Sequence, residues 1–333
     1  MRDNGGGQPQ ARTAKVSLLF RVVALFAVLS AFGQVALGGV VRVTDSGLGC
    51  PDWPLCHGQI IPPFELTTLI EYSHRLSASV LVILLLTVSI LALIHYRSNW
   101  LILAPSIAAI AFVFAAAVLG GVTVLTELDW WVVLFHLGIA ELVVASTVVI
   151  SVVAWGELLR SRDRVPEAGE SGRFNLLVLA TVIGVFLLIL SGSYMVGYGA
   201  GSSCGTWPLC RGSLFPDGTP YAIHMGHRFL SVLVGGLIVW TAVSARSRRD
   251  LRPDLGWSGL GMVLLFVAQV AVGAGTVLGG FAAGMKGLHL SMATLVWISV
   301  VLLAALVYVP QRAELMRLRS ATTPASNLEG MAS

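Results

Sequence analysis

The chain has 333 residues, of which 56% are hydrophobic and only 11% charged, and its mean hydropathy is +0.84. A soluble domain carries about 25% charged residues, so this composition excludes an ordinary soluble protein and indicates the bilayer as solvent. The net charge of +4 and the pI of about 9.1 would suit a nucleic-acid partner, but the basic residues are spread over several short segments, so we expect no nucleic-acid binding.

Eight segments are long and apolar enough to cross a membrane as helices. Crossing the hydrocarbon core takes roughly 20 mostly apolar residues, and a lone His, Glu or Arg near a helix end is tolerated in this assignment. The predicted spans are, in chain order, 17–40, 71–94, 101–125, 130–155, 174–197, 222–245, 257–280 and 287–309. The sequence therefore predicts an all-α integral membrane protein with eight transmembrane helices.

The basic residues between these spans predict the orientation, because cytoplasmic loops retain Lys and Arg. Fifteen of them fall on one side and three on the other. The larger group contains Arg2, Arg12, Lys15, Arg97, Arg160, Arg162, Arg164, Arg173, Arg246, Arg248, Arg249, Arg252, Arg312, Arg317 and Arg319; the smaller contains Arg42, Arg211 and Lys286. We expect a multi-pass protein of a prokaryotic cell membrane, in contact with lipid, with both termini in the cytoplasm.

An internal repeat divides the chain into two halves. GCPDWPLCHGQIIPP from Gly49 matches SCGTWPLCRGSLFPD from Ser203 at an offset of 154 residues. At an offset of 153, the pairs His74-Arg75 and His136-Leu137 match His227-Arg228 and His289-Leu290. Each unit holds an even number of spans, so both units enter the membrane from the same side. The sequence predicts two tandem parallel repeats, each a four-helix bundle.

This division predicts five segments. Two are short polar tails on the cytoplasmic side, and the first of them shows no signal-peptide cleavage pattern. The segments are a tail at 1–16, an N-terminal four-helix repeat at 17–156, a cytoplasmic linker at 157–173, a C-terminal four-helix repeat at 174–309 and a second tail at 310–333.

The four cysteines lie in the two long loops on the outer side. Cys50 and Cys56 share the first of these loops, and Cys204 and Cys210 share the second. An oxidising exterior favours a disulfide that staples each loop. A thiol redox relay or a metal site is the alternative, although the spacing of a zinc-binding CxxC motif is absent.

Four of the seven histidines are candidate metal ligands. His74 and His227 lie near the outer start of the second and sixth spans, and His136 and His289 near the outer start of the fourth and eighth. A rise of about 1.5 Å per residue places all four at similar depth. One such histidine usually forms an inter-helix hydrogen bond, but the duplicated pairing favours a haem held between facing helices, because imidazole suits iron.

Glycines occur on the neighbouring spans. They allow either close helix packing or the approach of a flat macrocycle. They are Gly38, Gly39, Gly120, Gly121, Gly192, Gly273 and Gly275.

Acidic residues distinguish the two halves. Glu71 stands three residues before His74, on the same helical face, whereas the second half has His224 at this position. A carboxylate there could relay protons or simply favour the start of the helix. Glu141, five residues after His136, faces the bundle or forms a structural hydrogen bond. Arg75 and Arg228 follow the helix histidines and could pair with haem propionates or anchor the helix at the interface.

The chain resembles the haem A synthase family over essentially all eight spans. The resemblance rests on the segment from Gln34 to Arg42, the GLGCPDWPLC loop and the second WPLC loop. It also rests on Glu71 with His74-Arg75, on His136, on His227-Arg228 and on His289. It implies oxidation of a methyl group of haem O to a formyl group, which gives haem A for terminal oxidases. It also implies disulfides Cys50–Cys56 and Cys204–Cys210.

The same resemblance implies a division of labour between the halves. The second half would hold a resident haem b through His227 and His289. The first would bind the substrate haem O through His74 and His136, with Glu71 as the catalytic acid or base. The implied partners are a haem O synthase and assembly factors of terminal oxidases.

Two other functions use the same four histidines. A di-haem b protein could carry electrons between quinol and an outer acceptor without a substrate pocket. A haem carrier could bind haem and release it unchanged. Analysis of extracted haems separates them, because only the synthase makes hydroxymethyl or formyl haem.

Overall fold

The computed structural model describes residues 16–159, 168–250 and 252–322. Eight helices occupy this part of the chain: α1 (Leu18–Val43), α2 (Leu66–His95), α3 (Trp100–Leu125), α4 (Trp130–Leu159), α5 (Ala168–Gly197), α6 (Thr219–Arg246), α7 (Pro253–Leu278) and α8 (Ala283–Thr322). Each contains a stretch long and apolar enough to cross a membrane. The predicted all-α integral membrane fold with eight spans is confirmed.

Local sequence signals set several helix starts. The Ser17 hydroxyl accepts a hydrogen bond from the Phe20 amide at 3.2 Å before α1, and the Asn99 side chain caps α3 in the same way. Pro220 and Pro253 stand in the first turns of α6 and α7, where the missing N–H is not needed. Inside lipid every backbone group needs a partner, so the helices end outside the hydrocarbon.

Several helices are longer than the spans predicted within them. The membrane-spanning stretches of α5 and α8, Gly172–Gly197 and Ala283–Val309, agree with the predicted 174–197 and 287–309 to within a few residues. The helix α2 starts at Leu66 instead of 71, α5 starts at Ala168 instead of 174, and α8 continues to Thr322 instead of ending at 309. Hydropathy marks where the apolar stretch ends, whereas backbone hydrogen bonding continues into polar sequence beside the membrane. The linker and tails predicted at 157–173, 1–16 and 310–333 lie partly outside the described residues.

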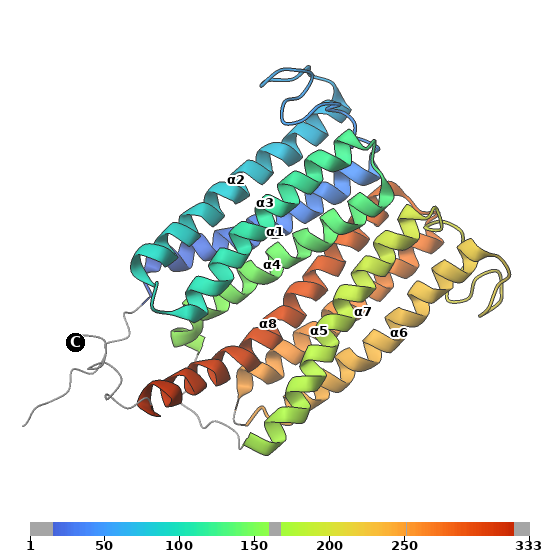
Figure 1. Ribbon diagram of the computed structural model, residues 1–333. Coiled ribbons are helices and arrows are strands. Elements are labelled where there is room, and N and C mark those ends of the chain that lie inside the picture. Colours follow the sequence, from blue (N-terminus) through green and yellow to red (C-terminus); the bar gives the residue numbers. More distant parts are fainter. Residues whose placement is uncertain (1–15, 160–167, 251, 323–333) are drawn as a thin grey trace, which may run out of the picture.

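The helices form two closed groups of four. In the first group α1 contacts α2, α2 contacts α3, α3 contacts α4, and α4 returns to α1; α5 to α8 contact one another in the same cyclic order. The groups meet through α1 with α8, α4 with α8 and α4 with α5 (Figure 1). These contacts support the predicted pair of four-helix bundles.

The helices α4 and α8 lie at the centre of the molecule. In each of these two helices, 56% of the apolar membrane-spanning stretch is buried inside the protein, against 17 to 33% in the other six helices. The outer helices expose large apolar side chains instead, such as Leu25, Ile83 and Leu264, as expected for surfaces in contact with lipid. The junction between the halves is therefore built mainly by two helices, and both carry candidate ligands.

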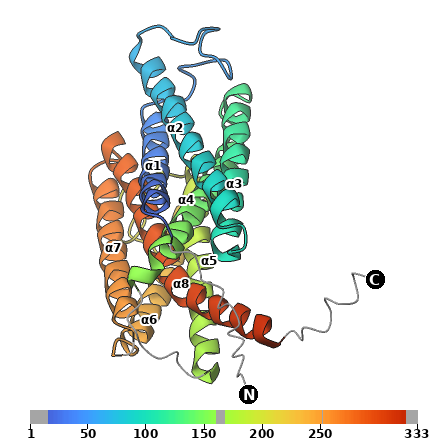
Figure 2. The ribbon, with the colours of Figure 1, turned by 90° about the vertical axis from the view of Figure 1, so that its left-hand side faces the viewer.

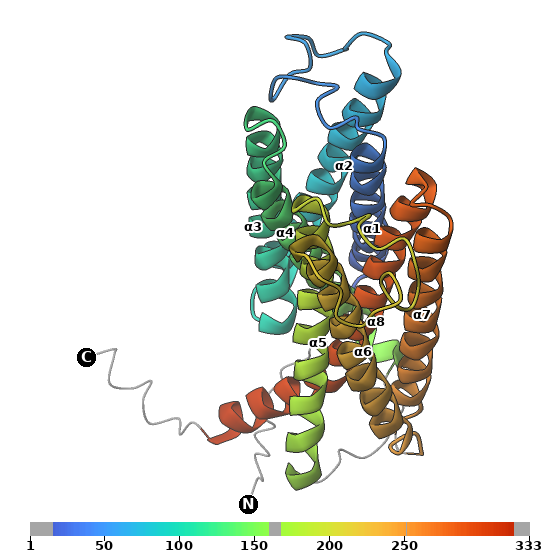
Figure 3. The ribbon, with the colours of Figure 1, turned by 90° about the vertical axis from the view of Figure 1, so that its right-hand side faces the viewer.

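The two long loops, 44–65 and 198–218, lie at one end of the bundle, here called the loop end (Figures 1 and 3). The last turns of α8 leave the bundle at the opposite end (Figure 2). All four candidate histidines lie close to the loop end. His74 and His227 each follow the start of their helix, Leu66 and Thr219, by eight residues.

Candidate functional site

Each candidate histidine packs its ring against a glycine of the preceding helix. A Cβ atom on Gly38 of α1 would lie 3.0 Å from Cε1 of His74, and one on Gly120 of α3 would lie 3.2 Å from Cε1 of His136. At such distances any larger residue would push the ring aside, so the glycines hold space for the imidazoles.

The second half repeats this arrangement. A Cβ atom on Gly192 of α5 would lie 3.2 Å from Cε1 of His227, and one on Gly273 of α7 would lie 2.9 Å from Cε1 of His289. Four of the glycines singled out in the sequence therefore face the four histidines. Two others, Gly39 and Gly121, face Leu290 and Trp53 instead.

The histidines come together in the predicted pairs. His74 and His136 are close enough to interact electrostatically, and so are His227 and His289. Nδ1 of His136 and Nδ1 of His289 are buried without a hydrogen-bond partner in the described part of the chain. A buried polar atom without a partner is costly, and here each belongs to a potential ligand.

These residues fit a haem. Each half offers two imidazoles from facing helices, with a glycine behind each ring and an unpartnered nitrogen in the pair. Within the described residues no group of three or more His, Cys, Asp or Glu side chains could hold a metal alone. A pair of axial ligands suits a metal whose remaining ligands belong to a macrocycle.

The first loop is fastened directly above the first pair. Cys50 and Cys56 form a disulfide. The Arg75 guanidinium donates to the carbonyls of Asp52 and Leu55, both at 2.7 Å, and to the Cys50 carbonyl at 2.9 Å. It also forms an ion pair with Glu71 at 2.6 Å. Arg75 therefore joins the loop to α2.

Glu71 takes part in the same set of bonds between the first loop and α2. Its side chain is only 5% exposed. One carboxylate oxygen binds Arg75, and the other accepts a hydrogen bond from the Cys50 amide at 2.8 Å. The loop and the carboxylate therefore hold each other in place.

The second loop has a related arrangement without the carboxylate. Cys204 and Cys210 form a disulfide, and Arg228 donates to the carbonyls of Pro208 and Cys204 at 2.9 and 3.3 Å. His224 occupies the place of Glu71, with Nδ1 3.1 Å from the Ala200 carbonyl and Nε2 3.3 Å from Arg228. The position that carries a carboxylate in one half carries an imidazole in the other.

Both arginines are thus engaged with loop carbonyls. Their predicted pairing with haem propionates stays a prediction. Arg75 and Arg228 each follow a histidine directly and hold the long loop of their half. Movement of a loop would therefore be transmitted to that histidine.

Sequence reasoning missed three side chains that contact the histidine rings. They are Gln34, Ser191 and Gln269, and the side-chain nitrogen of Gln269 on α7 lies 3.5 Å from Nε2 of His289. Gln34 of α1 contacts the ring of His74, and Ser77 of α2 contacts Gln34. Ser191 of α5 lies 2.7 Å from Nδ1 of His227. Gln34 was recognisable as a polar residue inside an apolar span, one helical turn from Gly38.

Glu141 lies between the halves. It is fully buried, and one carboxyl oxygen accepts a hydrogen bond from Thr294 of α8 at 2.8 Å, while its backbone carbonyl accepts from the Trp297 indole at 2.8 Å. Of the two expectations for this residue, the structural hydrogen bond is the one observed. Thr294 stands 153 residues after Glu141, so the repeat offset would have pointed to it.

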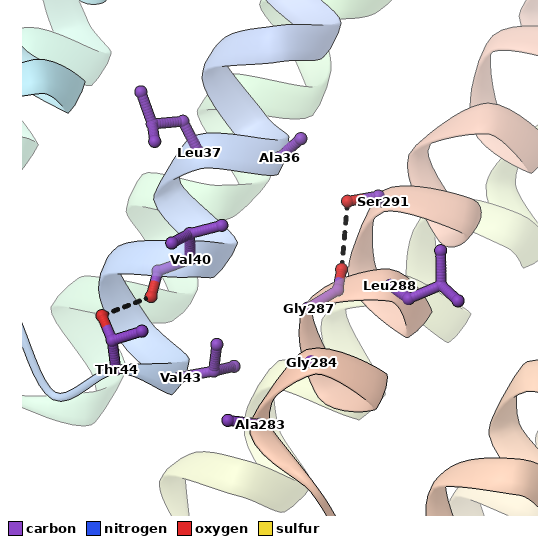
Figure 4. A pocket seen from close by; sticks show the side chains of 10 residues that line it. All are labelled: Ala36, Leu37, Val40, Val43, Thr44, Ala283, Gly284, Gly287, Leu288 and Ser291. Carbon is purple, nitrogen blue, oxygen red and sulfur yellow. Dashed lines mark hydrogen bonds between the residues drawn. The ribbon is translucent and has the colours of Figure 1, made fainter. Parts of the chain in front are cut away.

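An apolar groove of about 550 Å³ lies between α1 and α8 at the loop end (Figure 4). It is lined by small and aliphatic residues and by none of the four histidines. Its two hydroxyl groups already donate within their own helices, Thr44 to Val40 at 2.8 Å and Ser291 to Gly287 at 3.0 Å. The groove therefore offers an apolar surface at the boundary between the halves.

Fold and site together define a polytopic membrane protein with two pairs of histidines, each ring packed against a glycine of the preceding helix. Residues 21–301 match the family model described as cytochrome oxidase assembly protein. The chain belongs to this family.

Curated relatives are similar to most of the chain. A heme A synthase from an Exiguobacterium species is 28% identical over 81% of this chain and 87% of its own length. The heme A synthase of Halalkalibacterium halodurans is 28% identical over 82% of this chain and 94% of its own length. That of Exiguobacterium sibiricum is 29% identical, with 78 and 85% covered.

Proposed function

We propose that the chain is a haem A synthase, a membrane oxidoreductase that converts a methyl group of haem O to a formyl group. The observation that carries this proposal is the pair of histidine sites at matching depth in the two helix groups, each ring backed by a glycine. The names of the curated relatives agree with it and do not favour a di-haem electron carrier.

The two halves have different roles in this proposal. His227 and His289 hold a haem b as a resident cofactor, and His74 and His136 bind the substrate haem O. The difference at one position supports this assignment. The first half carries Glu71, which can exchange protons, whereas the second carries His224 held between a carbonyl and an arginine.

The chemistry requires both electron and proton transfer. Each hydroxylation of the methyl carbon takes its oxygen from water and removes two electrons and two protons. Loss of water from the twice-hydroxylated carbon leaves the formyl group. His227 and His289 would hold a haem b that supplies one-electron transfer, so the four electrons released for each formyl group would leave one at a time for an oxidant outside the chain. Glu71 accepts protons in the first half, and its bonds to Cys50 and Arg75 fix its carboxylate in place.

We also propose the orientation of the protein in the membrane and its partners in the cell. The distribution of basic residues supports cytoplasmic termini and haem sites toward the outer face of the cell membrane. A haem O synthase would supply the substrate, and assembly factors of terminal oxidases would receive the product. Reporter fusions placed after Gly58 and after Arg248 test the orientation, and activity of a periplasm-specific reporter at Gly58 alone is expected.

Extraction of haems tests the function. The chain is co-expressed with a source of haem O, and the extract is separated by chromatography and identified by mass spectrometry, beside a His74→Ala control. Formyl or hydroxymethyl haem found only with the intact chain is the expected result. Haem b alone with rapid quinol oxidation would establish the electron carrier, and haem passing unchanged between membranes would establish the carrier of haem.

A further inference from the structure

The first half has two arginines near the loop end, and the donors of Arg75 are occupied. Each terminal nitrogen of a guanidinium carries two N–H groups. Nη1 of Arg75 donates to the carbonyls of Asp52 and Leu55. Nη2 donates to the Cys50 carbonyl and to the Glu71 carboxylate. A further anion at these N–H groups would have to displace a bond that holds the first loop.

Arg42, in the last turn of α1, is the other arginine. At 3.6 residues per turn it lies on the same helical face as Ala31 and Val35, which stand eleven and seven residues earlier and are buried. This face of α1 therefore points into the protein. The Arg42 side chain forms no hydrogen bond or ion pair with any residue that the structure describes, although inward-facing charged groups are normally paired.

Arg42 also lies between the loop end and the ring of His74. Gly38 packs against this ring, and Arg42 follows Gly38 by four residues, which is one turn and a rise of about 6 Å. Because α1 runs toward the loop end (Figure 1), Arg42 is the nearer of the two to that end. Side chains of a helix lean toward its N-terminus, so the guanidinium can extend back toward the level of the ring.

The substrate supplies an anion of suitable chemistry. Haem O carries two propionate groups on one edge of its ring, and both are ionised at neutral pH. A charged carboxylate is costly in hydrocarbon, so this edge faces the nearer aqueous side, which for His74 is the loop end. A free guanidinium binds a carboxylate through two parallel N–H···O bonds. Arg42 has such a free guanidinium, whereas Arg75 has only its Nε–H left.

The second half has no arginine at the equivalent position. Gly38 and Gly192 face the first histidine of their halves at an offset of 154 residues, and the backbone hydrogen bonds after the two glycines repeat at the same offset. Arg42 therefore corresponds to Val196. A valine cannot bind a carboxylate, so this group is specific to the half that carries Glu71.

We propose that Arg42 binds a propionate of the substrate haem and so makes the first half selective for macrocycles with a free carboxylate on the edge toward the loop end. The inference deepens the proposed function and rests on it. Arg42 is a substrate-binding residue in this assignment, and Arg75 holds the loop.

Binding of esterified haem tests the assignment. Full-length protein in detergent micelles, with the haem of its second half bound, is titrated with haem O or with the dimethyl ester of haem O, whose propionates are uncharged. Absorbance follows binding, and the signal missing in His74→Ala belongs to the first half. Each ligand is compared with itself across the variants, so its partition into the micelle cancels.

Arg42→Gln should weaken binding of haem O about tenfold or more, because a charge-assisted pair is lost, and should leave binding of the ester unchanged. Arg42→Lys should retain part of the preference for the free acid, since the charge remains without the parallel bonds, and it carries the test if Arg42→Gln does not fold. Arg211→Gln is the matched control. Arg211 also lies on the outer side, with its guanidinium 5.2 Å from the centre of the Tyr221 ring, and its loss should leave the preference as in the wild type.

Three results would overturn the inference. Equal weakening of acid and ester in Arg42→Gln would show a structural role alone. An unchanged preference in Arg42→Gln would show that Arg42 binds something else, such as a lipid phosphate. A preference lost in Arg75→Gln and kept in Arg42→Gln would assign the propionate to Arg75. The absorbance of the second haem reports correct folding in every variant.

The outcome is separable from that of the proposed function. Formyl product from the wild type, together with an unchanged preference in Arg42→Gln, would refute the role of Arg42 alone. A preference that depends on Arg42, without any hydroxymethyl or formyl product from the wild type, would refute the proposed function alone.

Discussion

At the scale of single residues, Glu71 combines a structural and a chemical task. Its carboxylate fastens the first loop through Cys50 and Arg75, and the proposed chemistry needs a proton acceptor in the same half. Glu71→Gln keeps the bond to the loop, because the amide oxygen still accepts from the Cys50 amide, whereas both the ion pair with Arg75 and proton exchange are lost.

We expect Glu71→Gln to lower haem A formation about 100-fold or more, the range typical of general acid–base catalysis. The absorbance of the haem in the second half should be unchanged. Product is measured by chromatography of extracted haems. Wild-type product levels in Glu71→Gln would remove the carboxylate from the mechanism.

The glycine behind each histidine gives a second prediction. Gly273→Ala places a Cβ atom 2.9 Å from Cε1 of His289, so the ring must move and haem binding in the second half should fall at least several-fold. Gly261→Ala on the same helix is the control, since a Cβ there meets nothing within 4 Å. Haem content is measured by pyridine haemochrome absorbance. Equal haem content in both variants would show that the glycine does not position the ring.

Asp52 in the first loop gives a prediction about pH. Hydrogen bonds from the Gly58 amide at 2.7 Å and the His57 amide at 2.6 Å hold the pKa of this carboxyl below its ordinary value. A lowered pKa contributes stability that is complete above the ordinary value of about 3.9 and is lost as the pH falls through the lowered value. The second loop has Thr206 in this place, which accepts from the Arg211 amide at 3.0 Å.

Acidification below about pH 4 should therefore destabilise the first loop against local opening and leave the second loop unchanged. Hydrogen exchange of the His57 and Gly58 amides, compared with that of Arg211 in the same sample, measures the difference. Asp52→Asn should abolish the extra acceleration. The same acid response in that variant would exclude Asp52 as its origin.

At the scale of elements, the contact of α4 with α8 joins the two halves through Glu141 and Thr294. One oxygen of the buried carboxyl has no partner in the described residues, so removal of the hydroxyl would leave the whole group without one. Thr294→Val should lower the free energy of unfolding by about 1–3 kcal/mol. Denaturation in mixed detergent micelles measures it.

Ser299→Ala is the matched control for Thr294→Val. It lies on the same helix and is also buried, but its hydroxyl donates only to the Val296 carbonyl of α8 itself. Its effect should be clearly smaller. Equal destabilisation by the two substitutions would mean that Glu141 does not link the halves through Thr294.

The helices themselves were largely predictable from the sequence. Apolar runs located all eight spans, but they did not predict that α5 begins at Ala168 or that α8 continues to Thr322, because hydropathy does not follow a helix into polar sequence. The repeat also predicted which histidines lie at equal depth, since equal spacing from a helix start means equal height.

The contacts between elements were less predictable. The sequence singled out Gly38 and His74 separately, but not that one packs against the other. The bonds of Arg75 to loop carbonyls and of Gln34 to His74 depend on helix rotation and side-chain rotamers, which a hydropathy pattern does not contain. A polar residue in an apolar span signals only that some partner exists.

At the scale of the whole molecule, the two helix groups share one arrangement of helices and side chains and differ at a few positions near the histidines. Both have the histidine pair, the glycines, the disulfide and the arginine that holds the loop. Only the first has a carboxylate beside that arginine, and among the described residues only the second has a hydroxyl beside its first histidine, with the Ser191 oxygen 2.7 Å from Nδ1 of His227. This asymmetry is the basis for assigning substrate and cofactor to different halves.

The central claim is that this chain oxidises haem O. The most direct measurement incubates the purified chain, loaded with haem b, with haem O and a one-electron oxidant in water enriched in heavy oxygen, and analyses the haems by mass spectrometry. The account predicts hydroxymethyl haem that carries one labelled oxygen, followed by the formyl product. Recovery of unchanged haem O from folded, haem-loaded protein would contradict it.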